Sequence, residues 1–155
     1  MGIARSGGEP GYCDRVIDDR AAQLLRERPA DRTWLLCDDV PRTDFDEAAA
    51  AAGIAPIGCA WIEIDQERAR QILVHLLSTS MAHGHALMPA HRARWLADQF
   101  LSSAGKFGTR FATNTEGLPE ASGASWKPAT EHVFDAGVIA LGSSGTSCYW
   151  VAEDS

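Results

Sequence analysis

The chain has 155 residues, of which 45% are hydrophobic and 23% are charged, and its formal net charge is −7. This length suits one domain with one core, and the composition excludes a globally disordered chain. The acidic sign disfavours non-specific nucleic-acid binding, and no apolar run is long enough to span a bilayer.

The N-terminal residues and the cysteines indicate the cellular compartment of the protein. Residues 1–12 lack the apolar core of a secretory signal, so we expect a flexible lead-in to a single α+β domain over residues 13–155, in the cytoplasm. The cysteines Cys37, Cys59 and Cys148 fall in strand-like apolar runs and are expected to be buried thiols. Two lysines against twelve arginines, with abundant Ala, are typical of a GC-rich bacterial genome.

The first half of the chain alternates between helical and strand patterns. A helical period over residues 13–28 is followed by a strand over 33–37. Thr43 and Asp46 resemble a capping box that begins an Ala-rich helix, which Gly53 ends, and a second strand follows over 58–64. A strand, a helix and a strand in this order predict a right-handed crossover between parallel neighbours.

The second half begins with two amphipathic helices. Asp65 is placed to cap a helix that runs to about residue 81, and Pro89 is placed in the first turn of another that ends at Gly105. A third strand is expected within 107–113, and then a long loop over 114–130, anchored by Trp126.

The last residues predict an antiparallel hairpin around a Gly/Ser turn at 142–146. Residues 138–141 are apolar at every position, which is typical of a strand covered on both faces. The predicted fold is α+β with an α/β-like first half: a mixed sheet of about five strands closed by this C-terminal hairpin, with three to four helices packed on it.

Charge is segregated along the chain. Residues 33–67 hold one arginine against eight acids, whereas residues 68–110 hold six cationic side chains against one acid. These charges either pair with one another on a solvated surface or form an acidic patch that attracts a basic partner. The residues expected in such a patch are Asp38, Asp39, Asp44, Asp46, Glu47, Glu153 and Asp154.

A group of carboxylates provides the first catalytic hypothesis. If the two early strands are parallel neighbours, their carboxyl ends bring together Asp38, Asp39, Glu63 and Asp65. Such a group could hold a divalent metal ion that activates water or binds a phosphate. Each residue also has an ordinary structural role, since Asp is common in turns and at helix N-termini.

Histidines provide a second metal hypothesis. His83, His85 and His91 could supply nitrogen ligands to zinc or copper, although their spacing matches no metal motif. A polar loop between two helices explains the same residues, so no cofactor is expected on this ground.

We therefore favour a binding protein over an enzyme. The leading hypothesis is a small acidic cytoplasmic module, such as an inhibitor or immunity-type protein, for a basic toxin or nuclease. It depends on the absence of a recognisable catalytic motif, the compact size and the segregated acidic charge. The alternatives are a metal-assisted hydrolase or phosphoryl-transfer enzyme that uses the carboxylate group, and a structural subunit of a larger assembly.

Overall fold

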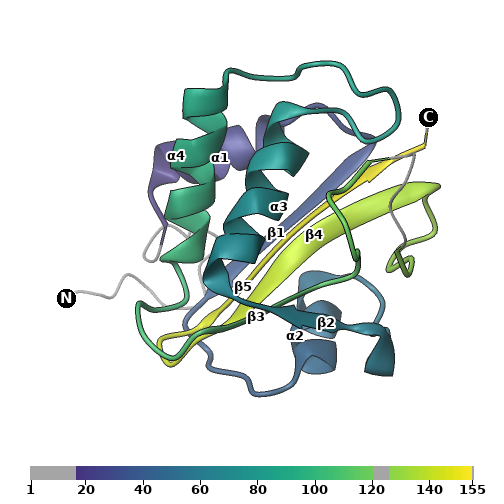
Figure 1. The fold of residues 1–155 in the computed structure, drawn as a ribbon. Coiled ribbons are helices and arrows are strands. Elements are labelled where there is room, and N and C mark those ends of the chain that lie inside the picture. The colour runs from purple at the N-terminus through teal and green to yellow at the C-terminus, as the bar shows by residue number, and fades with distance from the viewer. Residues whose placement is uncertain (1–16, 121–125, 155) are drawn as a thin grey trace.

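The computed structural model describes residues 17–120 and 126–154, which form helices packed on one sheet (Figure 1). The helices are α1 (Asp19–Glu27), α2 (Phe45–Ala52), α3 (Gln66–Ser78) and α4 (Ala90–Leu101), and a 3-10 helix, η2 (Gly58–Ala60), precedes β2. The strands are β1 (Arg32–Asp38), β2 (Ile62–Ile64), β3 (Arg110–Thr113), β4 (Phe134–Leu141) and β5 (Thr146–Glu153). This combination confirms the α+β class. The predicted lead-in, residues 1–12, lies outside the described residues.

The sheet is antiparallel throughout, with the strand order β1-β5-β4-β3-β2. The prediction of a mixed sheet with residues 33–37 and 58–64 as parallel neighbours is therefore wrong. β1 and β2 run in the same direction, but they are the two edges of the sheet. Three strands lie between them, because each strand of the C-terminal pair takes a different neighbour: β5 pairs with β1, and β4 pairs with β3.

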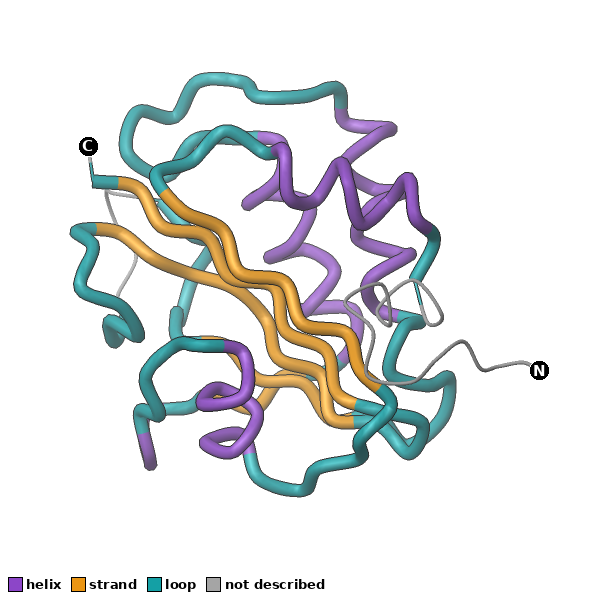
Figure 2. Tube along the Cα trace, turned by 180° about the vertical axis from the view of Figure 1, so that it is seen from behind, coloured by secondary structure: helices purple, strands orange, loops and turns teal. Residues whose placement is uncertain are grey.

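Helices cover both faces of the sheet, so the two central strands are buried on both sides. Val138 and Tyr149 belong to a core with α1, α3 and α4, whereas Ile139 and Trp150 belong to a core with α2. The two views agree with this arrangement. In Figure 1, α3 lies in front of the sheet, and in Figure 2, which shows the molecule from the opposite side, α2 lies in front of the sheet. Burial on both faces explains why β4 and β5 read as nearly continuous apolar runs.

Capping residues set the ends of the helices. The Asp65 carboxylate accepts from the Arg68 backbone N–H at 2.8 Å, which confirms the predicted N-cap of α3. The N-cap of α2 is Asp44 rather than Thr43, and Gly53 ends that helix in the left-handed conformation with φ 98°.

No helix in the described ranges 17–120 and 126–154 has the length and hydropathy that a membrane span requires.

A buried ion pair joins the end of β5 to the end of α1. Arg28 Nη2 lies 2.8 Å from Glu153 Oε2, and the guanidinium also donates to a backbone oxygen of α3. The Glu153 carboxylate accepts from Ser80 Oγ and from the backbone N–H groups of Met81 and Ala82. Burial alone raises the pKa of Glu153, but these four donors outweigh it and hold the pKa below its usual value.

A second buried carboxylate, Asp135 on β4, holds the loop that precedes it. It is 2% exposed, and its donors are Asn114 Nδ2, the backbone N–H groups of Ala129 and Thr130, the Thr130 hydroxyl and Trp150 Nε1. Because these donors come from β5, from the segment after β3 and from the loop itself, Asp135 fixes residues 128–130 against the sheet.

Candidate functional site

The carboxylates of the first catalytic hypothesis lie in two separate groups. Asp38 ends β1, whereas Glu63 and Asp65 lie in and after β2, at the opposite edge of the sheet. Four strand spacings separate these edges, which is roughly 19 Å at about 4.8 Å per spacing. The parallel pairing that was expected to bring Asp38 and Asp39 next to Glu63 and Asp65 does not exist, so one metal ion cannot bridge both groups.

These carboxylates have partners that explain them structurally. Arg42 Nη1 lies 3.1 Å from both carboxylate oxygens of Asp38, and Arg110 donates to both oxygens of Glu63 at 2.8 and 2.9 Å. The hydrogen bond from Arg110 lowers the pKa of Glu63, although both side chains are about half exposed. The Glu63–Arg110 pair therefore belongs to the solvated surface, where such pairs contribute little stability, whereas the Asp38 and Arg42 side chains are only about one-fifth exposed.

The residues proposed for the acidic patch are also divided. Asp44 and Glu47 are exposed at the start of α2, and Asp46 is half-buried, where it accepts from Gly58 N and Trp61 Nε1. Glu153 requires a correction: it is 7% exposed and is enclosed by the donors described above, so it does not present its charge to a partner.

Asp154 is exposed but lies far from the start of α2. The register places it beyond the first residue of β1, at the other end of the sheet from Asp38. It accepts from His132 Nδ1 at 3.0 Å and from Val133 N, and the hydrogen bond from His132 lowers its pKa. Sequence alone could not separate these acids, because their distances depend on strand order.

The histidines of the second metal hypothesis lie between α3 and α4. The rings of His83 and His85 stack at a centroid distance of 5.9 Å, and both side chains and that of His91 are exposed. Within the described residues, no group of three or more His, Cys, Asp or Glu side chains is placed to hold a metal ion.

Three loops meet at the end of the sheet where β1, β2 and β4 finish. They are residues 39–44, 104–109 and 142–145. Ser144 N donates to Ala104 O at 3.3 Å and joins the second and third loops, and Thr146 Oγ1, at the start of β5, donates to Val40 O of the first loop at 2.7 Å. Arg110 Nη1 donates to Thr43 O and so ties β3 to the first loop. We call these loops, with the flanking residues Asp38, Glu63, Asp65 and Arg110, the sheet-end surface.

The sheet-end surface combines exposed apolar side chains with acidic charge. Phe107 is 85% exposed and Val40 is 47% exposed, although both belong to residue types that usually lie inside. Five carboxylates and three cationic side chains lie on this surface, and two of the cations are those paired with Asp38 and Glu63. Phe107 was not among the predicted site residues, because residues 107–113 alternate in part and predict a strand, whereas β3 begins only at Arg110.

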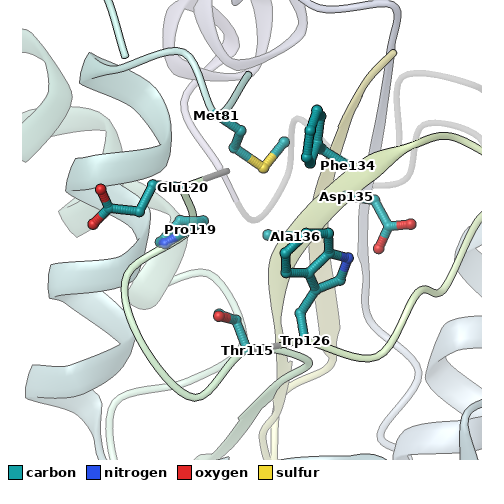
Figure 3. Close-up of a pocket in the computed structure, with 8 residues that line it drawn as sticks. All are labelled: Met81, Thr115, Pro119, Glu120, Trp126, Phe134, Asp135 and Ala136. Atoms are coloured by element: carbon teal, nitrogen blue, oxygen red, sulfur yellow. The ribbon is translucent and has the colours of Figure 1, made fainter. Parts of the chain in front are cut away.

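A cavity between the described residues of the loop 114–130 and β4 is too small for a ligand. It measures about 10 Å³, the space of about one water molecule, and its walls include Met81, Trp126 and Phe134 (Figure 3). The Trp126 and Phe134 rings pack at a centroid distance of 5.8 Å, while the Asp135 carboxylate points away from the cavity. Trp126 therefore anchors its loop.

Comparison with known proteins adds no assignment to this geometry. No protein-family model matches the chain, and neither a curated protein nor a solved structure is significantly similar to it. Function is therefore inferred from the surfaces of the chain itself.

Proposed function

We propose that the protein is a cytoplasmic binding protein of the inhibitor or immunity type, and that it captures a protein with a basic surface through the sheet-end surface. The observation that carries this proposal is the exposure of Phe107. A Phe side chain that is 85% exposed contributes little to the core, whereas an exposed aromatic side chain is a typical anchor of a protein interface.

The negative charge of the chain favours a partner with a basic surface. The net charge of −7 and the excess of carboxylates on the sheet-end surface attract cationic proteins over a Debye length of about 8 Å at physiological salt. Exposed charges of this kind increase the rate of association more than they slow dissociation. An interface that includes Phe107, Val40 and these carboxylates would therefore provide both an apolar anchor and electrostatic steering.

The test compares the wild-type protein with a double variant, Phe107→Ser and Val40→Ser, as bait in an extract of the source cell. Both side chains are exposed, so the substitutions are expected to change the free energy of unfolding by less than about 1 kcal/mol. The matched control is Val133→Ser. Val133 is 55% exposed and lies just before β4, at the other end of the sheet and about 24 Å from the sheet-end surface.

The expected result is a basic protein that binds the wild type and the Val133→Ser control but not the double variant. Its association rate with the wild type should fall as salt is raised, since salt screens exposed charges. Equal capture of the same partner by the double variant would exclude the sheet-end surface. Capture of partners that are not basic, or an association rate independent of salt, would exclude the proposed chemistry.

A further inference from the structure

β1 is the edge of the sheet that lacks the features which usually prevent pairing with another chain. Among residues 17–120 and 126–154, both β1 and β2 have a strand neighbour on one side only. β2 is three residues long, with the charged Glu63 at its centre, whereas β1 is seven residues long and pairs with β5 without interruption from Arg32 to Asp38. Between these two charged ends, β1 holds no Pro and no charged side chain. Its sequence therefore does not oppose a further strand.

The hydrogen-bond pattern of the sheet turns alternate backbone groups of β1 outward. Gly142 N donates to Gly145 O at 3.0 Å in the turn of the hairpin, and this bond fixes which residues of β4 and β5 form the bonded pairs. Antiparallel bonds alternate along each strand, so the backbone of Trp34 is turned towards β5, whereas the N–H and C=O groups of Thr33 and Leu35 are turned outward. In the parts of the chain that the structure describes, no strand pairs with this outer side.

Apolar side chains lie at the rim of the same edge. Leu35 packs against the core with α1, and Leu36 packs against the core with α2, but both side chains are only half-buried. A further strand beside β1 would remove more of their surface from water, which is favourable. The edge therefore offers both backbone groups and apolar surface to a partner strand.

The charges at the two ends of β1 select a second copy of β1 as that partner. In an antiparallel pair with Leu35 opposite Leu35, the Arg32 of each copy lies opposite the Asp38 of the other copy. Both side chains then lie on the same face, because their positions differ by an even number. A parallel pair in register would place like charges side by side, and a shift of the antiparallel pair by two positions would place Arg32 opposite Leu36 or Val40. Opposite charges across strands are favourable, and like charges are not.

Each of these two charges also has a neighbour in its own chain. Arg42 donates to the Asp38 carboxylate, and Glu131 lines the same surface pocket as Arg32. The pairs between copies therefore add little affinity and serve to fix the register. The affinity comes from the backbone hydrogen bonds and from the burial of Leu35 and Leu36.

We infer that β1 pairs with β1 of a second copy, antiparallel and centred on Leu35, and so joins two sheets into one in a two-fold symmetric dimer. Such an interface is isologous, so each contact occurs twice. Because a single pair of strand edges buries less area than a standard interface, the expected Kd is about 10 µM. This inference does not depend on the proposed function, since it concerns the side edge of the sheet.

Sedimentation-velocity ultracentrifugation of the full chain from about 1 to 200 µM measures the dimer. Arg32→Asp and Asp38→Arg should each raise the Kd at least about tenfold, because like charges would then face each other at both ends of the pair. Mixed together, the two variants should associate about as tightly as the wild type, because opposite charges again face each other at both ends. The matched control is Arg20→Asp on α1, which is exposed and should dimerise like the wild type.

A wild type that stays monomeric up to about 200 µM would overturn the dimer. A Kd that is unchanged in both charge variants would exclude the β1 edge, and failure of the mixture to associate would exclude the antiparallel register. If a charge variant does not fold, Thr33→Pro decides: it removes an outward N–H and no bond to β5, so it should abolish the dimer and leave the monomer folded. An unchanged Kd in Thr33→Pro would also overturn the inference.

Discussion

Replacing Glu153 with Gln should destabilise the protein by about 3–5 kcal/mol, because it leaves a buried guanidinium without its counter-charge. The Arg28 side chain is fully buried, and its Nη2 lies 2.8 Å from Glu153 Oε2. The same carboxylate accepts from Ser80 Oγ and two backbone N–H groups, so the amide cannot satisfy all of these donors. Domains are typically stable by about 5–15 kcal/mol, so the loss is a large part of the total.

Urea unfolding monitored by Trp fluorescence measures this loss of stability. A double-mutant cycle with Arg28→Met isolates the interaction energy between Arg28 and Glu153 from their other contacts. Either single change leaves one buried charge alone, whereas the double variant leaves none, so the double variant should lose much less than the sum of the single variants. The matched control is Arg70→Met, which breaks the exposed pair with Asp98 and should cost less than about 1 kcal/mol. A Glu153→Gln loss as small as the control, or additive losses in the cycle, would refute the reasoning.

The same carboxylate should shape the response of the protein to acid. The folded pKa of Glu153 lies below the unfolded value of about 4.3, so the protonated carboxyl is disfavoured in the folded state. Its contribution is fully present above about pH 4.3 and is lost as the pH falls through the lower folded pKa. Unfolding curves of the wild type and Glu153→Gln should therefore converge in acid, and a stability difference that stays constant with pH would contradict this assignment.

Two further predictions concern packing and thiol chemistry. Gly137→Ala should destabilise the protein by about 1–3 kcal/mol or more in thermal unfolding, because the new Cβ would clash with a backbone oxygen of β5. In the control Gly117→Ala, the new Cβ meets nothing within 4 Å. Equal losses of stability in the two variants would contradict the packing argument. Cys59 is exposed in η2, so the prediction of a buried thiol in a strand is wrong for this residue, and in a Cys13→Ser background Ellman's reagent should label Cys59 in the native protein. It should not label Cys148, whose thiol is buried and has a raised pKa; rapid native labelling of Cys148 would exclude that burial.

Local patterns predicted the elements of this fold better than their pairing. The helical period and the Asp65 cap located α3, because both signals depend on residues within a few turns. The edge position of β2 could not be predicted in that way, since it depends on β4 and β5, which follow β2 by about seventy or more positions in the chain. The crossover rule describes parallel neighbours, and here the two strands share a direction without being neighbours.

The candidate sites show the same limit. Glu153 reads as an exposed charge at the end of a strand, and only the structure brings Arg28 against it. His132 stands alone in the sequence, whereas its partners Trp34 and Asp154 lie in β1 and just after β5. Surfaces made by loops that are far apart in the chain leave no spacing that a sequence pattern can reveal.

The central position of β4 and β5 also has a consequence for how the chain folds during synthesis. Arg32 of β1 pairs with Ala152, so β1 cannot pair with β5 until nearly the last residues of the chain have been synthesised. Contacts between such distant residues slow folding, and the nascent β1 carries Trp34 and other apolar side chains meanwhile. We expect ribosome-bound chains that end before residue 146 to remain protease-sensitive throughout β1, and protection to appear only when β5 has emerged.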